Sequence, residues 1–219
     1  MPAFQTEHQK LYEAIRSAIL SGEYAPGEKL PQRKLAQKFG ATTITVREAL
    51  RSLESEGLIM IEPKWGAMVV EITPEKIQGR YIVREALEGM AACLAARKAS
   101  REEREELEAL AERCDRELSG DTLSRSEKAN LHYSLHERIV KVTRCEELIQ
   151  AINRINLQTI ILSNAYHIDW RADRPGQHGN LVRAILSGEP ERAEAAMRAH
   201  IRDGYTMELK ALMGRAPVA

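Results

Sequence analysis

Four of the six histidines stand at spacings that could bring their imidazoles together. His132 and His136 are four residues apart, so on one helix they face the same way. His178 lies ten residues before Gly188 and His200 lies twelve residues after it. In an antiparallel helical hairpin both would lie roughly 15–18 Å from the turn, at about 1.5 Å per residue. Because imidazole binds divalent transition metals well, the spacing predicts a four-histidine metal site; the alternative is four separate core or surface histidines.

A second group of polar residues could contact DNA. Thr42, Thr43 and Thr45 stand at the start of an expected short helix, where hydroxyls and free backbone N–H groups can bind phosphate. Arg47 lies one turn further along, within reach of a phosphate or a guanine edge. The alternative for each threonine is that it only caps the helix.

Two short helices would position these residues. Apolar spacing predicts helices over 32–39 and from about 43 to 56, joined around Gly40. The second helix must expose its N-terminal end if it is to enter the major groove. Arg33 lies early in the first of the two helices, and it is a further expected DNA contact.

A β-hairpin is expected next. Residues 58–61 and 68–72 are β-like runs, and the segment 62–67 between them contains Pro63 and Gly66. Gly66 is expected at the tip, where a glycine lets the backbone approach the duplex closely. Two short helices followed by a hairpin predict a winged helix-turn-helix DNA-binding domain over residues 1–73.

The remainder of the chain reads as helix. Thr73 and Pro74 form a helix start, with a capping residue followed by proline at the first helical position. We therefore expect a mainly α protein whose second domain, residues 74–219, is an all-α bundle. Its expected helices span about 74–99, 101–118, 125–142, 146–165, 176–187 and 190–213.

Composition narrows the class of protein. The 219 residues carry no net charge, but the stretch 28–51 holds six basic residues and two acidic ones, so a local basic face is possible. Three widely spaced cysteines indicate reduced thiols in a cytoplasmic protein. No signal-like N-terminus and no apolar run near 20 residues is present, which argues against secretion and a membrane span.

The N-terminal pattern resembles a known family. The segment from Ala18 to Ile59 reads AILSGEYAPGEKLPQRKLAQKFGATTITVREALRSLESEGLI, and it looks like the DNA-binding domain of GntR-type bacterial regulators. The resemblance implies a homodimer that binds a short palindromic operator. It also implies DNA contacts by Arg33, Thr42, Thr43, Thr45, Arg47 and Gly66.

One departure from the family pattern affects base preference. The family usually has Ser-Arg-Thr-Pro where this chain has Thr42-Thr43-Ile44-Thr45. An arginine at this place could make a bidentate guanine contact worth ~1–3 kcal/mol of discrimination. Because Thr43 replaces it, we expect an operator preference unlike that of typical relatives. Ile44 could instead contact a thymine methyl group, and equal binding to an operator with uracil in place of thymine would count against this.

The C-terminal pattern resembles the all-helical FCD domain of the FadR branch of these regulators. The similar segments are YIVREALE at 81–88, HGNLVRAI at 178–185 and MRAH at 197–200. The resemblance implies a metal held by one Asp and three His, and the Asp position is His132 here. Four neutral imidazoles favour Zn²⁺ or Ni²⁺ over Mn²⁺ or Mg²⁺.

An effector site is expected near this metal. Arg84, in the first helix of the second domain, could pair with the carboxylate of a small-molecule effector. The alternative is an intrahelical pair with Glu88 at i+4. The loop residues His167, Trp170, Arg171 and Arg174 could line a pocket entrance, although ordinary loop positions are the simpler interpretation.

Two other functions are weighed against a metabolite-responsive regulator. A metal-dependent enzyme of the zincin type would need Glu directly after the first histidine, and that residue is Tyr133. We therefore expect no enzyme. A metal-responsive regulator, in which the metal itself is the signal, is the closer rival. Metal titration alone would change DNA binding by a metal sensor, whereas a metabolite sensor would keep its metal and respond to a small organic acid.

Overall fold

The computed structural model describes residues 6–165, residue 168 and residues 176–214. The loop positions His167, Trp170, Arg171 and Arg174 lie outside the described residues. The chain divides into two compact units. The first contains Met1–Ile72 together with Leu157–Ala165, and the second contains Thr73–Asn156 and Tyr166–Ala219.

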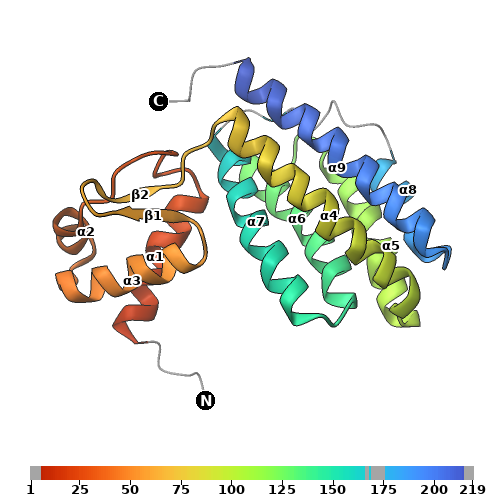
Figure 1. The fold of residues 1–219 in the computed structure, drawn as a ribbon, viewed down its shortest axis with the longest axis horizontal. Helices are drawn as coiled ribbons and strands as arrows, with labels where there is room; N and C mark the ends of the chain where they lie inside the picture. Colours follow the sequence, from red (N-terminus) through yellow and green to blue (C-terminus); the bar gives the residue numbers. More distant parts are fainter. Residues whose placement is uncertain (1–5, 166–167, 169–175, 215–219) are drawn as a thin grey trace. The chain divides into compact units, whose positions relative to one another are not determined.

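The first unit contains the predicted winged helix-turn-helix (Figure 1). Its core is built by apolar side chains at helical spacing, among them the fully buried Ile15, Leu50 and Leu53. Because these positions recur every three or four residues, each helix turns one apolar face inward. The elements are α1 (Glu7–Leu20), α2 (Gln32–Phe39), α3 (Thr43–Ser55), β1 (Ile59–Glu62) and β2 (Gly66–Val69).

The turn between α2 and α3 depends on two residues. Gly40 ends α2 in the left-handed region at φ 63°, where a residue with a side chain would be strained. Thr42 is the N-cap of α3, and its Oγ1 accepts a hydrogen bond of 3.2 Å from the backbone N–H of Thr45. The capping alternative for Thr42 is therefore realised, and it fixes the point at which α3 begins.

The hairpin is tighter than the sequence predicted. We expected residues 62–67 to separate the strands, but Glu62 pairs with Gly66 and Ile61 with Ala67, so the turn is only Pro63-Lys64-Trp65. Gly66 has φ 78°, which lets the second strand begin directly after the turn. A bridge between Lys29 and Met68 extends this sheet, a contact that the sequence did not reveal.

The second unit is helical, as predicted. Two of its helices begin with capping boxes: Ser100 with Glu103 begins α5, and Ser124 with Glu127 begins α6. The helices are α4 (Pro74–Lys98), α5 (Arg101–Glu117), α6 (Arg125–Val142), α8 (Gln177–Leu186) and α9 (Pro190–Met213). Helix α7 (Glu146–Ala165) begins in this unit, but its part from Leu157 onward is assigned to the first unit, whereas the sequence placed all of it in the second domain. No helix among the described residues is long and apolar enough to cross a membrane. All three cysteines are free thiols.

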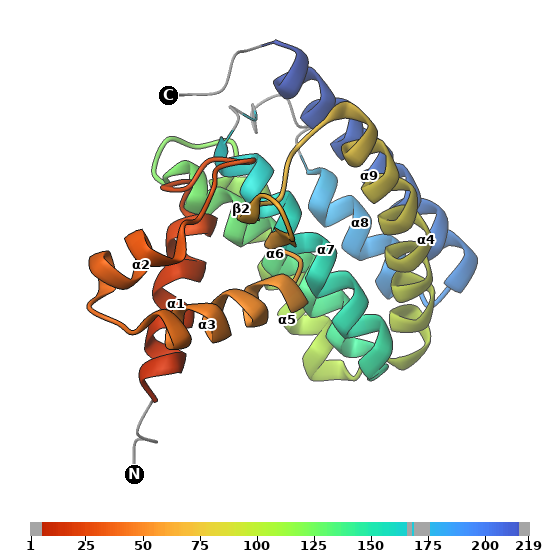
Figure 2. The same cartoon turned by 60° about the vertical axis from the view of Figure 1, so that its left-hand side comes forward.

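Helices α4 and α9 lie side by side in the second unit (Figures 1 and 2). Ala91, Ala92 and Ala95 are buried on α4, and small side chains of this kind allow close approach of neighbouring helices. Helix α4 also packs against α6, and α8 packs against α9. The inner faces of α4, α6, α8 and α9 are thereby brought together, and the predicted site residues of the second domain lie on these four helices.

Candidate functional site

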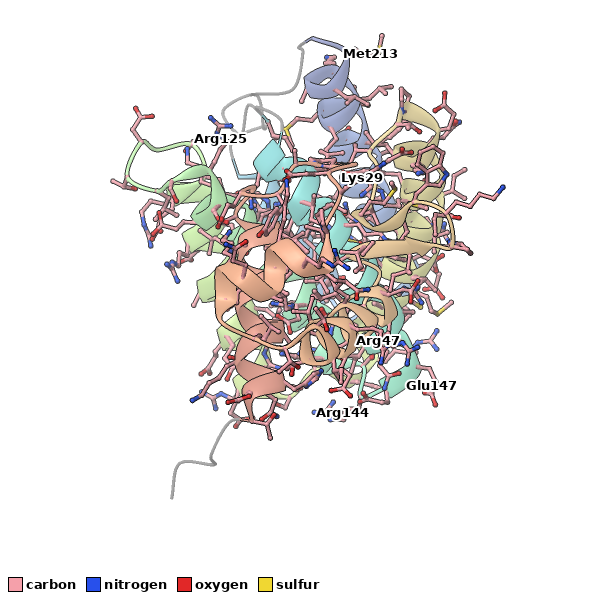
Figure 3. The ribbon with its side chains drawn as sticks, turned by 90° about the vertical axis from the view of Figure 1, so that its left-hand side faces the viewer. Lys29, Arg47, Arg125, Arg144, Glu147 and Met213 are labelled. Carbon is pink, nitrogen blue, oxygen red and sulfur yellow. The ribbon has the colours of Figure 1, made fainter. Side chains whose placement is uncertain are left out.

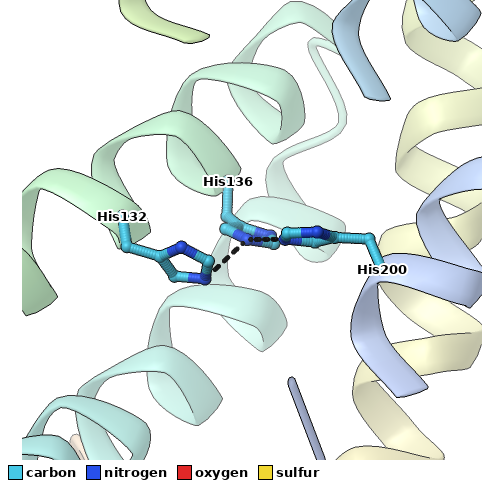
Figure 4. Close-up of side chains that lie close together, drawn as sticks. All are labelled: His132, His136 and His200. Atoms are coloured by element: carbon cyan, nitrogen blue, oxygen red, sulfur yellow. Dashed lines mark hydrogen bonds between the residues drawn. The ribbon is translucent and has the colours of Figure 1, made fainter. Parts of the chain in front are cut away.

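The four predicted histidines meet in the interior of the second unit. His132 and His136 come from α6, His178 from α8 and His200 from α9. The Nε2 atoms of His132 and His136 are 3.1 Å apart, and those of His136 and His200 are 3.2 Å apart (Figure 4). His178 adjoins this group, with its Nε2 3.2 Å from Nδ1 of His132. The ring centroids of His178 and His200 are 5.3 Å apart, as the hairpin geometry about Gly188 predicted.

Two carboxylates orient two of these rings. Nδ1 of His136 contacts Glu88 Oε2, and Nδ1 of His178 lies 2.8 Å from Asp115 Oδ1. Asp115 also accepts hydrogen bonds from the backbone N–H groups of His178 and Gly179, which holds its carboxylate at the start of α8. An ionised carboxylate only accepts, so each imidazole donates its Nδ1–H. The Nε2 atoms of His136 and His178 then carry lone pairs.

The cluster has too few protons for its own contacts. Nδ1 of His132 faces Nε2 of His178, and Nε2 of His132 faces Nε2 of His136. Both facing atoms carry lone pairs, and neutral His132 has one N–H to offer. With all of these rings neutral, one of the two contacts brings lone pairs together unless a cation lies between them.

Protonation does not readily remove this conflict. Burial and the surrounding imidazoles hold the pKa of His132 well below its usual value. The same causes hold the pKa of His200 well below its usual value, and burial also lowers the pKa of His178 despite Asp115. His132, His178 and His200 are therefore held in the neutral form that binds metal ions.

The donor set fits a divalent transition metal. His132, His136 and His200 each offer a ring nitrogen, and these atoms all lie within 4.8 Å of one another. A tetrahedral ion with bonds of about 2.0 Å separates its ligand nitrogens by roughly 3.3 Å, close to the 3.1 Å and 3.2 Å found here. Such nitrogen donors suit Zn²⁺ or Ni²⁺ better than the hard ions Mg²⁺ and Mn²⁺.

Arg84 forms the intrahelical pair that was the alternative to an effector contact. Its Nε donates a hydrogen bond of 2.7 Å to Glu88 Oε1, so the intrahelical pair is formed. Arg84 is only 2% exposed, and it also lines a cavity together with His132 and His200. Burial opposes ionisation of Glu88, but Arg84 and His136 outweigh it and lower its pKa to about 2. Glu88 therefore connects the arginine to the histidine cluster.

Sequence reasoning missed the two orienting carboxylates. Glu88 was considered only as a partner for Arg84, and its spacing gave no sign of His136, 48 residues away. Asp115 carried no signal, because it lies on a different helix from both His178 and the rest of the cluster.

Replacing Glu88 by Gln should weaken metal binding about 10–100-fold, the usual cost of losing a partner that orients a ligating histidine. Glutamine keeps the size but removes the charge that holds the Nδ1–H of His136. Competition titration of Zn²⁺ against a chelating dye measures the change. Glu75→Gln, at an exposed position on the same helix, is the matched control. Equal affinities for the two variants would show that Glu88 does not support metal binding by the histidine cluster.

The predicted DNA-contacting residues lie on the surface of the first unit. Thr42 and Thr43 are exposed at the start of α3, and Thr45 is half-buried. Arg47 follows on the exposed face of α3 (Figure 3), and Ile44 is 60% exposed, so both are accessible to a duplex. The other two predicted contacts, Arg33 on α2 and Gly66 at the end of the wing turn, are exposed as well.

The side chains of Arg33 and Arg47 make no hydrogen bond or ion pair with the described part of the chain. Lys38 differs, because its ammonium group contacts Glu23 and donates to the Tyr24 hydroxyl at 3.0 Å. Trp65, which the sequence analysis passed over, is 63% exposed in the wing turn, and the Nζ of Lys29 lies 4.7 Å from its ring centroid.

A winged helix-turn-helix joined to a helical domain that buries a cluster of histidines is an arrangement typical of a transcription regulator. Residues 7–69 match the model of the bacterial regulatory proteins of the gntR family, and residues 80–203 match the FCD domain. The protein belongs to the GntR family and carries an FCD domain, as the sequence resemblance implied. These families are transcriptional regulators and not enzymes.

Individual relatives agree with this assignment. The chain is 27% identical over 147 residues to the HTH-type transcriptional regulator YdhC of Bacillus subtilis, a match that covers 67% of this chain and 65% of that protein. It is 24% identical to the Uxu operon transcriptional regulator of Escherichia coli, over 91% of this chain and 85% of the relative. A GntR structure from Rhodococcus has the same fold, with a TM-score of 0.72 at 18% identity, covering 94% of this chain and 99% of that one.

Proposed function

We propose that this protein binds a palindromic DNA operator as a homodimer, and that a small carboxylate controls it at a metal-containing pocket in the FCD domain. The main support for a bound metal is the shortage of N–H donors between the neutral imidazoles of the cluster, which a divalent cation would relieve. His132, His136, His178 and His200 would hold the ion, and Zn²⁺ or Ni²⁺ suits four imidazoles. The ion would supply a positive charge that attracts an anionic effector.

The surface of α3 supports the DNA-binding half of the proposal. In a winged helix-turn-helix the second helix enters the major groove with its N-terminal residues against the bases. Thr42, Thr43, Thr45 and Arg47 occupy that end of α3, while Arg33 and Gly66 would contact the flanking backbone. A regulator of this kind would act beside the chromosome, in the bacterial cytoplasm.

The position of Arg84 supports the effector half. A cavity beside the histidine cluster is lined by Arg84, His132 and His200. A guanidinium has five donors, and the pair with Glu88 uses the Nε–H. An effector carboxylate between the metal and Arg84 would therefore meet positive charge on both sides.

Effector binding would then alter the placement of the helices that supply the ligands. Helices α4, α6, α8 and α9 all contribute residues to the cluster or the cavity. A ligand that prefers one arrangement of these helices shifts the population toward it, and DNA binding responds if the two arrangements differ in operator affinity.

A metal-responsive regulator is the second candidate, and the four-histidine ligand set supports it. Four imidazoles can complete a tetrahedral ion without any ligand from outside the protein. In that case the metal would be the signal.

Metal analysis followed by operator-binding titrations tests both candidates. We expect about one equivalent of divalent metal per chain and operator affinity that responds to a small carboxylic acid while the metal stays bound. A response to Zn²⁺ alone, with none to any acid, would favour the metal sensor. Absence of bound metal after incubation with Zn²⁺ or Ni²⁺ would reject the metal pocket.

A further inference from the structure

The tip of the wing presents an exposed aromatic ring. Trp65 is 63% exposed and lies in the turn between β1 and β2. The turn has a defined shape, because the backbone N–H of Trp65 donates to the carbonyl of Glu62 at 3.2 Å and Gly66 follows at φ 78°. The indole Nε1–H has no acceptor among the described residues. Trp65 therefore projects both a flat apolar ring and a free donor from the wing.

A lysine from outside the hairpin lies against this ring. Lys29 is exposed (Figure 3), and its Nζ lies 4.7 Å from the centroid of the Trp65 ring. An indole face attracts an ammonium group more strongly than the other aromatic rings do. The backbone beside Lys29 is fixed as well, because the N–H of Leu30 donates to the carbonyl of Ala67 on β2 at 2.8 Å. One face of the indole is therefore covered by a positive charge.

The charge at this end of the hairpin favours a nucleic acid as the partner of Trp65. Lys29 and Lys64 stand there against one acidic residue, Glu62, and all three are exposed. Phosphates attract such a pair of lysines, whereas an apolar protein surface would leave both charges unpaired. The recognition helix α3 belongs to the same compact unit, so the wing and α3 can act on one duplex.

The minor groove is the part of a duplex that this tip fits. It is about 6 Å wide, too narrow for a helix, whereas the major groove of about 12 Å accepts α3. Because Lys29 covers one face of the Trp65 ring, the ring cannot stack with both faces between base pairs while the two side chains stay in contact. The indole therefore enters by its edge, which carries the Nε1–H.

We infer that Trp65 reads the minor groove next to the bases that α3 reads: its Nε1–H donates to N3 of adenine or O2 of thymine, and Lys29 binds an adjoining phosphate. At a G·C pair the N2 amino group of guanine projects into this groove and sets a second donor against the indole N–H. The wing should therefore prefer A·T pairs at this position. This inference rests on the DNA-binding half of the proposed function and is independent of the metal and the effector.

Duplexes selected from a random-sequence library with the full chain supply the DNA probes. They should carry A·T pairs beside the bases read by α3. Replacing these pairs by G·C should weaken binding about fivefold or more, the usual cost of one mismatched pair. Replacing them by inosine·cytosine should restore binding, because inosine has the major-groove edge of guanine but lacks its N2 amino group. Fluorescence anisotropy measures each affinity.

Trp65→Phe is the discriminating variant, because it keeps an exposed ring but removes the Nε1–H donor. The preference for A·T and inosine·cytosine over G·C should fall several-fold in this variant. Lys29→Ala should keep the order of preference and reduce the slope of log affinity against log salt by about one for each wing that is bound. Lys141→Ala, at an exposed position on α6 in the second unit, is the control and should change neither quantity.

The remaining outcomes separate this inference from the proposed function. Selected duplexes without the A·T preference, or equal binding of the G·C and inosine·cytosine duplexes, would overturn minor-groove reading and leave DNA binding by α3 intact. An unchanged A·T preference in Trp65→Phe would assign that preference to the shape of the groove, and it would overturn the role of Trp65. If the selection enriches no sequence, operator binding itself is rejected, and the inference is rejected with it.

Discussion

His136→Ala should lower the affinity for Zn²⁺ by more than about 100-fold, beyond the range for losing an outer partner of a ligand. The Nε2 of His136 lies within 3.2 Å of the Nε2 atoms of both His132 and His200, so its removal takes the central donor from the cluster. It also leaves Glu88 without the imidazole that its buried carboxylate contacts. Competition titration with a chelating dye measures the affinity, and elemental analysis measures the metal per chain.

Thermal unfolding gives an independent measurement of the same effect. A ligand present at 100 times its Kd stabilises the folded state by about 2.7 kcal/mol. Zn²⁺ should therefore raise the Tm of the unaltered protein and leave that of His136→Ala nearly unchanged. His8→Ala, on α1 in the first unit, is the control and should respond to Zn²⁺ normally. A variant without His136 that retained a full equivalent of tightly bound zinc would contradict the four-histidine site.

Arg47→Ala should weaken operator binding by one of two distinguishable amounts. If Arg47 reads a guanine, each half-site should lose about 1–3 kcal/mol, and specificity should relax at one base position. If it binds a phosphate, affinity should fall similarly for all sequences, and the slope of log affinity against log salt should decrease by about one. Fluorescence anisotropy with labelled duplexes at several salt concentrations distinguishes the two results.

Arg101→Ala is the matched control for this measurement. Arg101 is exposed in the second unit, where its Nε lies 3.1 Å from Glu105 on the next turn of α5. Its loss should leave operator affinity and the salt slope unchanged. Equal operator binding by Arg47→Ala and the unaltered protein would place the recognition surface elsewhere than the N-terminal end of α3.

Local sequence signals predicted the helices well. The Thr73-Pro74 start lies where the structure begins α4, with Thr73 as the N-cap. Such signals act through hydrogen bonds within four residues, so neighbouring residues determine them almost completely. The prediction of the hairpin was less accurate, because the register of a strand pair depends on the partner strand and on Gly66 at the turn.

The histidine cluster marks the limit of what spacing can predict. The i, i+4 relation of His132 and His136 and the similar distances of His178 and His200 from Gly188 follow from helix geometry alone. The sequence therefore determined which imidazoles could meet. It did not determine that α6 would face the hairpin of α8 and α9, because that depends on the packing of side chains far apart in the chain.

The sequence by itself determined the GntR pattern, the winged helix-turn-helix with Arg47 exposed on α3, and the set of four histidines. Only the tertiary structure decided which carboxylates orient the imidazoles and that Arg84 is held by Glu88. The reason is physical. Helix positions and caps are set by hydrogen bonds between near neighbours, whereas burial and the pairing of charges arise only when distant helices pack together.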